Sequence, residues 1–166
     1  MILQPTLTAE RVSDLAPSLL AEHGVRALLV DLDDTLVASN GSDIAPDARR
    51  WLQTLQNCDV AVAILSNGSR ARVRTWSERL GVPGLALVGK PLGFAFRRGL
   101  ALTETPADET AMVGDQLFTD VLGANLTGVM SILVTPLSAG CLPHTRALRR
   151  LEHRLLGGEY GRTLHR

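Results

Sequence analysis

Short apolar runs alternate with helical patterns of hydrophobic residues along most of the chain. The apolar runs that predict β-strands are Val25–Val30, Val60–Leu65, Leu85–Val88, Thr110–Val113 and Met130–Val134. The segments that predict helices are Ala9–Glu22, Pro46–Asn57, Arg70–Leu80, Phe94–Leu102, Phe118–Thr127 and Thr145–Leu156. Strands that alternate with helices are typical of βαβ units. The pattern therefore predicts an α/β fold with a doubly wound, mostly parallel sheet of five strands.

Polar residues follow four of the predicted strands at the point where each strand ends. The segment 31–35 follows the first strand, and the segment 66–68 follows the second. Lys90 follows the third strand, and the segment 114–120 follows the fourth. Because the carboxyl ends of parallel strands lie at one edge of a sheet, these four segments are expected to meet there. This edge is the predicted functional site.

Three aspartates are crowded into the segment after the first strand. Asp31 and Asp33 lie two positions apart, and Asp34 follows directly. Carboxylates this close repel one another and resist ionising together unless a cation or a hydrogen-bond donor compensates. The segment therefore predicts a metal ion, while Asp34 is expected to cap the turn that follows.

The composition indicates one globular domain. The chain has 166 residues, of which 45% are hydrophobic and 20% charged, enough for one buried core and short for two. We expect a single domain over residues 1–166, with an N-terminal extension at 1–24 and a basic helix and tail at 144–166. Seventeen basic residues balance seventeen acidic ones, which argues against a protein that binds nucleic acid through its phosphates.

The charge is uneven along the chain. The segment 144–166 holds six arginines and two glutamates, and its leucines recur at helical spacing between the arginines. This pattern suits the surface of an anionic membrane, and it equally suits a terminal helix that docks its leucines on the sheet. No charged leader with an apolar core and no apolar run of membrane-spanning length stands out. These features predict a cytoplasmic protein, with peripheral contact at the inner membrane face left open.

The order of the four polar segments resembles that of the haloacid dehalogenase (HAD) phosphatase superfamily. That superfamily has an Asp-x-Asp-x-Thr strand end, a Ser or Thr after the next strand, a Lys, and a final acidic motif. The stretch GDQLFTDVLG at 114–123, the turn at 66–68, the pair Lys90–Pro91 and the opening Gln4–Leu7 are similar to the YqeG family of small bacterial HAD phosphatases. That family is related to the phosphatidylglycerophosphate phosphatases of mitochondria and plastids. The resemblance extends to about Pro136.

The resemblance implies a Rossmann-like HAD fold and hydrolysis of a phosphate monoester, and the acid pair suits this chemistry. An ionised carboxylate at a strand end can attack phosphorus and form an aspartyl-phosphate, a role that fits Asp31. Asp33 fits the general acid that protonates the leaving group and then the base that activates water. Lys90 supplies positive charge for the phosphoryl oxygens. We therefore predict Asp31, Asp33 and Lys90 as catalytic residues.

Four residues form the predicted substrate-binding set: Thr35, Ser66, Asn67 and Lys90. The Ser66 hydroxyl and the Asn67 N–H suit a phosphate oxygen, because a turn that opens a helix presents N–H groups to an anion. Thr35 is expected to brace the loop after Asp33 through its hydroxyl.

The predicted metal is Mg²⁺, which prefers oxygen ligands. The predicted ligand set is Asp31, the backbone carbonyl of Asp33, Asp115 and Asp120. For Asp120 the superfamily implies either a metal-bound water or the orientation of Lys90.

No segment has room for the cap domain that many HAD phosphatases carry. An uncapped site admits a large or surface-bound substrate, or takes its cover from another subunit, so an oligomer is compatible with the sequence. The resemblance implies phosphatidylglycerophosphate, a phospholipid, as the phosphate monoester. A soluble ester such as a sugar phosphate or a nucleotide is the alternative. A third hypothesis is a HAD-fold binding protein with little turnover.

Three arginines, Arg70, Arg72 and Arg74, follow the Ser66 turn at alternating positions. Residues at alternating positions on a helix cannot all face one pocket. One or two of them are therefore candidates to steer an anionic substrate, and the sequence does not distinguish which.

Overall fold

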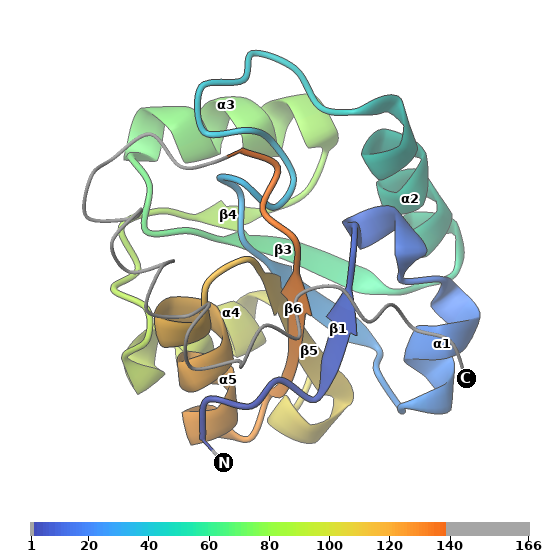
Figure 1. Ribbon diagram of the computed structural model, residues 1–166, viewed down its shortest axis with the longest axis vertical. Helices are drawn as coiled ribbons and strands as arrows, with labels where there is room; N and C mark the ends of the chain where they lie inside the picture. Colours follow the sequence, from blue (N-terminus) through green and yellow to red (C-terminus); the bar gives the residue numbers. More distant parts are fainter. Residues whose placement is uncertain (1, 139–166) are drawn as a thin grey trace.

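A six-stranded parallel sheet forms the centre of the computed structural model, which describes residues 2–138 (Figure 1). The strands are β1 (Leu7–Ala9), β2 (Ala27–Val30), β3 (Ala61–Leu65), β4 (Gly84–Leu85), β5 (Thr110–Gly114) and β6 (Met130–Val134). Their order across the sheet is β1-β6-β5-β2-β3-β4, and every neighbouring pair is parallel. The predicted α/β class and parallel sheet are confirmed, with six strands in place of five.

Helices cover both faces of this sheet. They are α1 (Pro17–Glu22), α2 (Pro46–Asn57), α3 (Arg70–Leu80), α4 (Gly93–Thr103) and α5 (Leu122–Thr127), with short 3₁₀ turns η1 (Val12–Asp14) and η2 (Ala107–Glu109) and a π-helical turn η3 (Leu117–Val121). Successive side chains of a strand point to opposite faces. Val30 of β2 therefore packs in one core cluster with Trp76 of α3, while Leu29 packs in another with Phe96 of α4. Figure 1 shows the same division, with α4 and α5 on one side of the sheet and α1 to α3 on the other.

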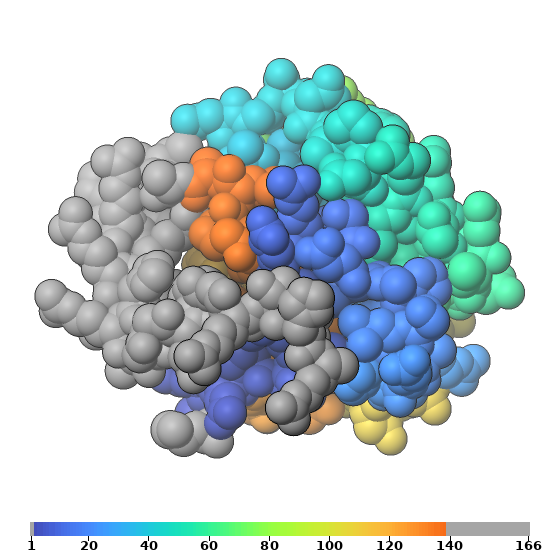
Figure 2. Space-filling view, turned by 45° about the vertical axis from the view of Figure 1, so that its right-hand side comes forward, coloured from blue at the N-terminus to red at the C-terminus, as the bar shows by residue number. Residues whose placement is uncertain are grey.

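The predicted helix Ala9–Glu22 is confirmed over its last six residues, as α1, and is wrong before Pro17. The chain forms β1, whose Leu7 pairs with Ile132 of β6, then the turn η1, and begins a helix at Pro17, where a proline suits the first helical turn. Figure 2 shows the N-terminal residues in blue directly against the orange residues that end β6, where the Thr135 N–H donates to the Glu10 carbonyl at 3.2 Å. A strand this short forms because β6 offers it an edge, which local periodicity does not reveal.

Two other predicted elements change in detail. The predicted helix Phe118–Thr127 is divided into η3 and α5. The predicted strand Leu85–Val88 overlaps β4 at Leu85 alone, and the strand does not extend to Val88 because Leu87 adopts a left-handed φ of 50°. The predicted helix Thr145–Leu156 lies outside the described residues.

A cap domain would be inserted in one of two connections between elements of the sheet. Residues 31–45 join β2 to α2, and α3 with short turns joins β3 to β4. Within residues 2–138, neither connection contains a further domain, so this part of the chain has the uncapped fold that the sequence predicted. Across the same residues, no helix combines the length and apolar character needed to cross a membrane.

Candidate active site

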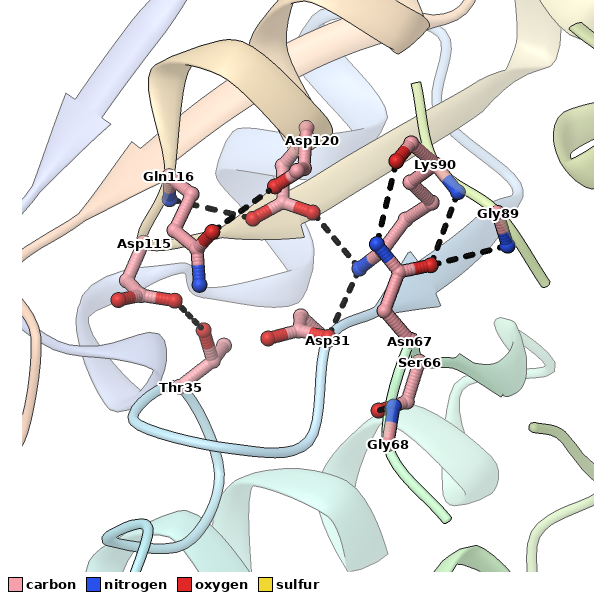
Figure 3. A network of polar contacts seen from close by, with 11 residues as sticks. Asp31, Thr35, Ser66, Asn67, Gly68, Gly89, Lys90, Asp115, Gln116 and Asp120 are labelled. Carbon is pink, nitrogen blue, oxygen red and sulfur yellow. Dashed lines mark hydrogen bonds and ion pairs between the residues drawn. The ribbon is translucent and has the colours of Figure 1, made fainter. Parts of the chain in front are cut away.

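Four segments meet at the carboxyl edge of the sheet, as shown in Figure 3. Asp31 follows β2 directly, and its N–H donates to the Val113 carbonyl of β5 at 2.9 Å. The Lys90 Nζ lies 2.7 Å from Asp31 Oδ1 and 2.7 Å from Asp120 Oδ1. The Lys90 side chain is 2% exposed, so this ion-paired group is the floor of the site.

Burial and charge set the ionisation of this group. Burial raises the pKa of Asp31 to about 7; Asp120 adds to the increase and Lys90 opposes it. Burial by itself would lower the pKa of Lys90, but the carboxylates of Asp120 and Asp31 outweigh it and hold that pKa above its usual range. Lys90 therefore remains charged at neutral pH.

Three buried carboxylates lie close enough to share a cation. Oxygens of Asp31, Asp115 and Asp120 all lie within 4.8 Å of one another. One lysine cannot neutralise three ionised carboxylates, and oxygen donors of this kind suit a hard divalent cation. The residues present therefore fit a divalent metal. The Asp33 carboxylate is not part of this cluster.

The raised pKa of Asp31 predicts how the stability of the metal-free protein depends on pH. A carboxyl group whose pKa is higher in the folded than in the unfolded chain contributes stability at low pH and loses it as the pH rises through the folded value. For Asp31 that interval runs from about 4 to about 7. In EDTA, we expect the free energy of unfolding to fall over this interval more steeply in the wild type than in Asp31→Asn, as measured by urea denaturation. Parallel pH profiles of the two proteins would contradict the expectation.

Asp33 lies nearer the surface and pairs with an arginine. Its Oδ1 is 2.6 Å from the Nε of Arg72, and the two side chains are 30% and 27% exposed. The Nη2 of Arg72 also donates to the Ala38 carbonyl at 3.2 Å. Val73 and Trp76 of α3 are buried in the core, which turns Arg72 toward the loop after β2. The structure thus selects Arg72 from the three arginines that the sequence left undistinguished.

Thr35 and Ser66 are both buried beside the aspartates. The Thr35 hydroxyl donates to Asp115 Oδ1 at 3.3 Å, so it orients a candidate metal ligand. The Ser66 Oγ accepts the Gly68 N–H at 3.0 Å. A Cβ at Gly68 would lie 3.1 Å from both Ser66 Oγ and Asp33 Oδ2, so the backbone itself closes this side of the site.

The Asn67 side chain holds the loop that carries Lys90 (Figure 3). Its Oδ1 accepts the N–H groups of Gly89 and Lys90 at 3.0 and 2.9 Å, and its Nδ2 donates to the Lys90 carbonyl at 3.1 Å. The sequence assigned the Asn67 N–H to substrate and did not indicate this side-chain role, because the contacts join residues 22 and 23 positions apart.

Replacing Asn67 with alanine removes all three of these hydrogen bonds. We expect kcat to fall about tenfold, because displacement of a catalytic group by a fraction of an ångström has effects of this order. A steady-state assay on any hydrolysed ester measures it. The control Asn57→Ala changes the last residue of α2, and it is expected to retain wild-type kcat. Equal activity of Asn67→Ala and this control would show that the clamp is dispensable.

Asp34 and Asp120 have different surroundings. Asp34 is buried and its carboxylate accepts the Ser39 N–H at 3.0 Å and the Ser39 hydroxyl at 2.6 Å, so it organises its own loop. Asp120 is packed over Gly114, where a Cβ would lie 2.2 Å from its carboxylate, and it accepts the Gln116 N–H at 3.1 Å. The sequence did not indicate that Gly114 must remain without a side chain.

Comparison with known proteins identifies relatives of this chain. The chain matches the HAD-hydrolase-like family over residues 87–136. It is 34% identical over 152 residues to the probable phosphatase YqeG of Bacillus subtilis, covering 92% of this chain and 88% of that protein. The 3-deoxy-D-manno-octulosonate 8-phosphate phosphatase of Yersinia pestis has the same fold, with a TM-score of 0.53 at 17% identity over 89% of this chain and 91% of that one.

Two longer relatives match part of their length. One is the ribulose-1,5-bisphosphate 5-phosphatase of Halopiger xanaduensis, 34% identical over 102 residues, 56% of this chain and 43% of that protein. The other is the chloroplastic/mitochondrial phosphatidylglycerophosphate phosphatase 1 of Arabidopsis thaliana, 29% identical over 153 residues, 82% of this chain and 42% of that protein. The chain spans less than half the length of each.

The parallel sheet, the acidic carboxyl edge and these matches define a phosphatase of the HAD type. Its similarity to the Bacillus subtilis protein covers nearly the whole of both chains. The chain belongs to the YqeG family.

Proposed function

We propose that this protein hydrolyses a phosphate monoester with Mg²⁺ through an aspartyl-phosphate on Asp31. The observation that carries the proposal is the buried group of Asp31, Lys90, Asp115 and Asp120 at the carboxyl edge of the sheet. It joins a carboxylate nucleophile to a fixed cation and to further acids with the donor set of a divalent metal.

The first step transfers the phosphoryl group to the enzyme. A carboxylate oxygen of Asp31 attacks phosphorus in line, and the bond between phosphorus and the ester oxygen breaks. Asp33, in its protonated form, gives its proton to the leaving oxygen, so an alcohol departs. The position of Asp33 suits this role, because its side chain is 30% exposed and that of Asp31 is 7% exposed, so Asp33 lies nearer the opening through which an alcohol leaves.

The second step returns the enzyme to its starting state. Asp33, now ionised, takes a proton from a water molecule whose oxygen bonds to phosphorus. The bond between phosphorus and the Asp31 oxygen breaks, and inorganic phosphate leaves. The same carboxyl group thus acts as acid and then as base, a contribution of about 10²- to 10⁴-fold to the rate.

Positive charge and hydrogen-bond donors hold the transferred group. Lys90 is already fixed beside Asp31, and we assign the Ser66 hydroxyl and the Asn67 N–H to the phosphoryl oxygens. Thr35 supports the site through Asp115.

The proposed ligands for Mg²⁺ are Asp31, Asp115, Asp120 and the Asp33 carbonyl. When bound, the ion supplies positive charge that neutralises the carboxylates and polarises the phosphate. Asp31, whose ionised form burial alone disfavours, would be held ionised beside a bound cation.

The proposed substrate is phosphatidylglycerophosphate, handled by peripheral contact with a membrane at its cytoplasmic face. A relative over 82% of this chain carries that activity in its name. The loop that carries Lys90 and the start of α4 also expose three large apolar side chains, Leu87, Leu92 and Phe94, at 58%, 57% and 44%. Apolar side chains beside a site suit a lipid surface better than water.

Phosphate release from anionic vesicles tests this function. Vesicles that contain phosphatidylglycerophosphate are compared with a panel of soluble sugar phosphates and nucleotides, each with Mg²⁺ and with EDTA. We expect release that requires Mg²⁺ and is greatest from the vesicles. Release from one soluble ester alone would identify that ester, and not the lipid, as the substrate. No release from any substrate, including a generic aryl phosphate, would leave the binding protein as the remaining hypothesis.

A further inference from the structure

Two cations border the candidate site at different depths. Lys90 is 2% exposed and lies at the floor against Asp31, whereas Arg72 is 27% exposed and lies beside Asp33. Lys90 therefore serves the phosphoryl group that Asp31 receives. Arg72 is placed to serve something else.

The position of Arg72 follows from the role of Asp33. This step rests on the proposed function, in which Asp33 protonates the leaving oxygen. A group 2.6 Å from the Asp33 carboxylate borders the leaving alcohol and not the transferred phosphoryl group. A substituent on that alcohol, a few bonds from the ester oxygen, would reach the guanidinium.

The guanidinium has donors available for such a substituent. Its contacts with Asp33 and the Ala38 carbonyl use two N–H groups of the five that an arginine carries. The planar arrangement of the others suits bidentate binding of a phosphate or a carboxylate. Both contacts of Arg72 are to the loop after β2, so the side chain is held at the rim of the site.

The other arginines of α3 are placed differently. Arg74 lies 3.9 Å from Glu78 and Arg79 lies 3.5 Å from Asp43, and both are more exposed than Arg72. Arg70 is exposed at the start of the helix. Of the four, Arg72 alone contacts a residue of the proposed chemistry in the part of the chain that the structure describes.

We propose that Arg72 is a specificity-determining residue that binds a second anionic group on the leaving alcohol of the substrate. The enzyme would then favour molecules with two anionic groups, one transferred to Asp31 and one held by Arg72. A phosphodiester or a second phosphate monoester on the alcohol meets this requirement.

A pair of soluble substrates that differ in one group tests the proposal. Glycerol 1-phosphate and glycerol 1,3-bisphosphate present the same ester, and the second places an additional phosphate on the leaving alcohol. We expect wild-type kcat/KM to favour the bisphosphate. In Arg72→Gln this preference should fall about 10- to 100-fold, as expected for the loss of charged hydrogen bonds, mainly through KM. Arg72→Lys should lose less, because it keeps the charge without the planar donors.

Arg74→Gln is the matched control, since it removes a charge from the same helix away from Asp33. It should keep the wild-type preference. Equal losses on both substrates in Arg72→Gln would show that Arg72 merely positions Asp33, and this would overturn the proposal. A wild type that hydrolyses both esters without preference would overturn it as well. A wild type that releases phosphate from neither ester, nor from the lipid and soluble panel, would overturn the proposed function and this inference with it.

Discussion

Replacing Asp31 with asparagine is expected to reduce phosphate release at least about 10³-fold, in the range seen when a catalytic nucleophile is removed. The amide has nearly the shape of the carboxylate but does not attack phosphorus as an anion does. The loss should appear in kcat with any substrate that the wild type hydrolyses. Steady-state phosphate release with Mg²⁺ measures it.

The same substitution should leave the protein folded. Asp31 shares its buried surroundings with Asp115 and Asp120, so an amide relieves repulsion, and Lys90 keeps its ion pair with Asp120. We expect a Tm equal to or above that of the wild type in EDTA. If Asp31→Asn lost its fold as well as its activity, the loss of activity would not identify Asp31 as the nucleophile.

Asp34→Asn is the matched control for Asp31→Asn. Asp34 is also buried, and it lies outside the cluster of three carboxylates. Its φ of 64° is a conformation that asparagine adopts readily. We expect this control to lose some stability, because its charged hydrogen bonds to Ser39 weaken, and to retain activity within a few-fold. Activity that falls equally in both variants would argue against a particular role for Asp31.

Replacing Lys90 with methionine is expected to lower the free energy of unfolding by about 3–5 kcal/mol in EDTA, the range for breaking a buried ion pair from one side. The substitution leaves Asp31 and Asp120 buried without the cation that lies 2.7 Å from each. Urea denaturation at neutral pH measures the effect. Phosphate release should be lost as well, because Lys90 is also the proposed positive charge for the phosphoryl oxygens beside Asp31.

Divalent cations should partly reverse this loss of stability. The three carboxylates remain in Lys90→Met, and a bound cation replaces part of the missing positive charge. We therefore expect Mg²⁺ to raise the Tm of Lys90→Met more than that of the wild type. Arg98→Met removes an exposed charge of α4 and should change the stability by less than about 0.5 kcal/mol. No stabilisation of either protein by Mg²⁺ would argue against the proposed metal site.

Gly114 and Asn67 have roles in the site that the sequence did not predict. Gly114 has no side chain, and its importance appears once Asp120 is seen packed over it. Asn67 was assigned through its backbone, whereas its side chain clamps the loop of Lys90. In both cases the deciding contact depends on how two segments lie in space.

The sequence by itself determined the succession of strands and helices and the placement of acids, Ser66 and Lys90 after successive strands. These features are local, since a period of two or of 3.6 residues and the residue after an apolar run can be read without any partner. The tertiary structure decided what depends on partners. It added β1, which forms against the edge of β6, and it brought Lys90 between Asp31 and Asp120. It also selected Arg72, because the burial of Val73 and Trp76 fixes the rotation of α3 and thereby the one arginine that faces Asp33.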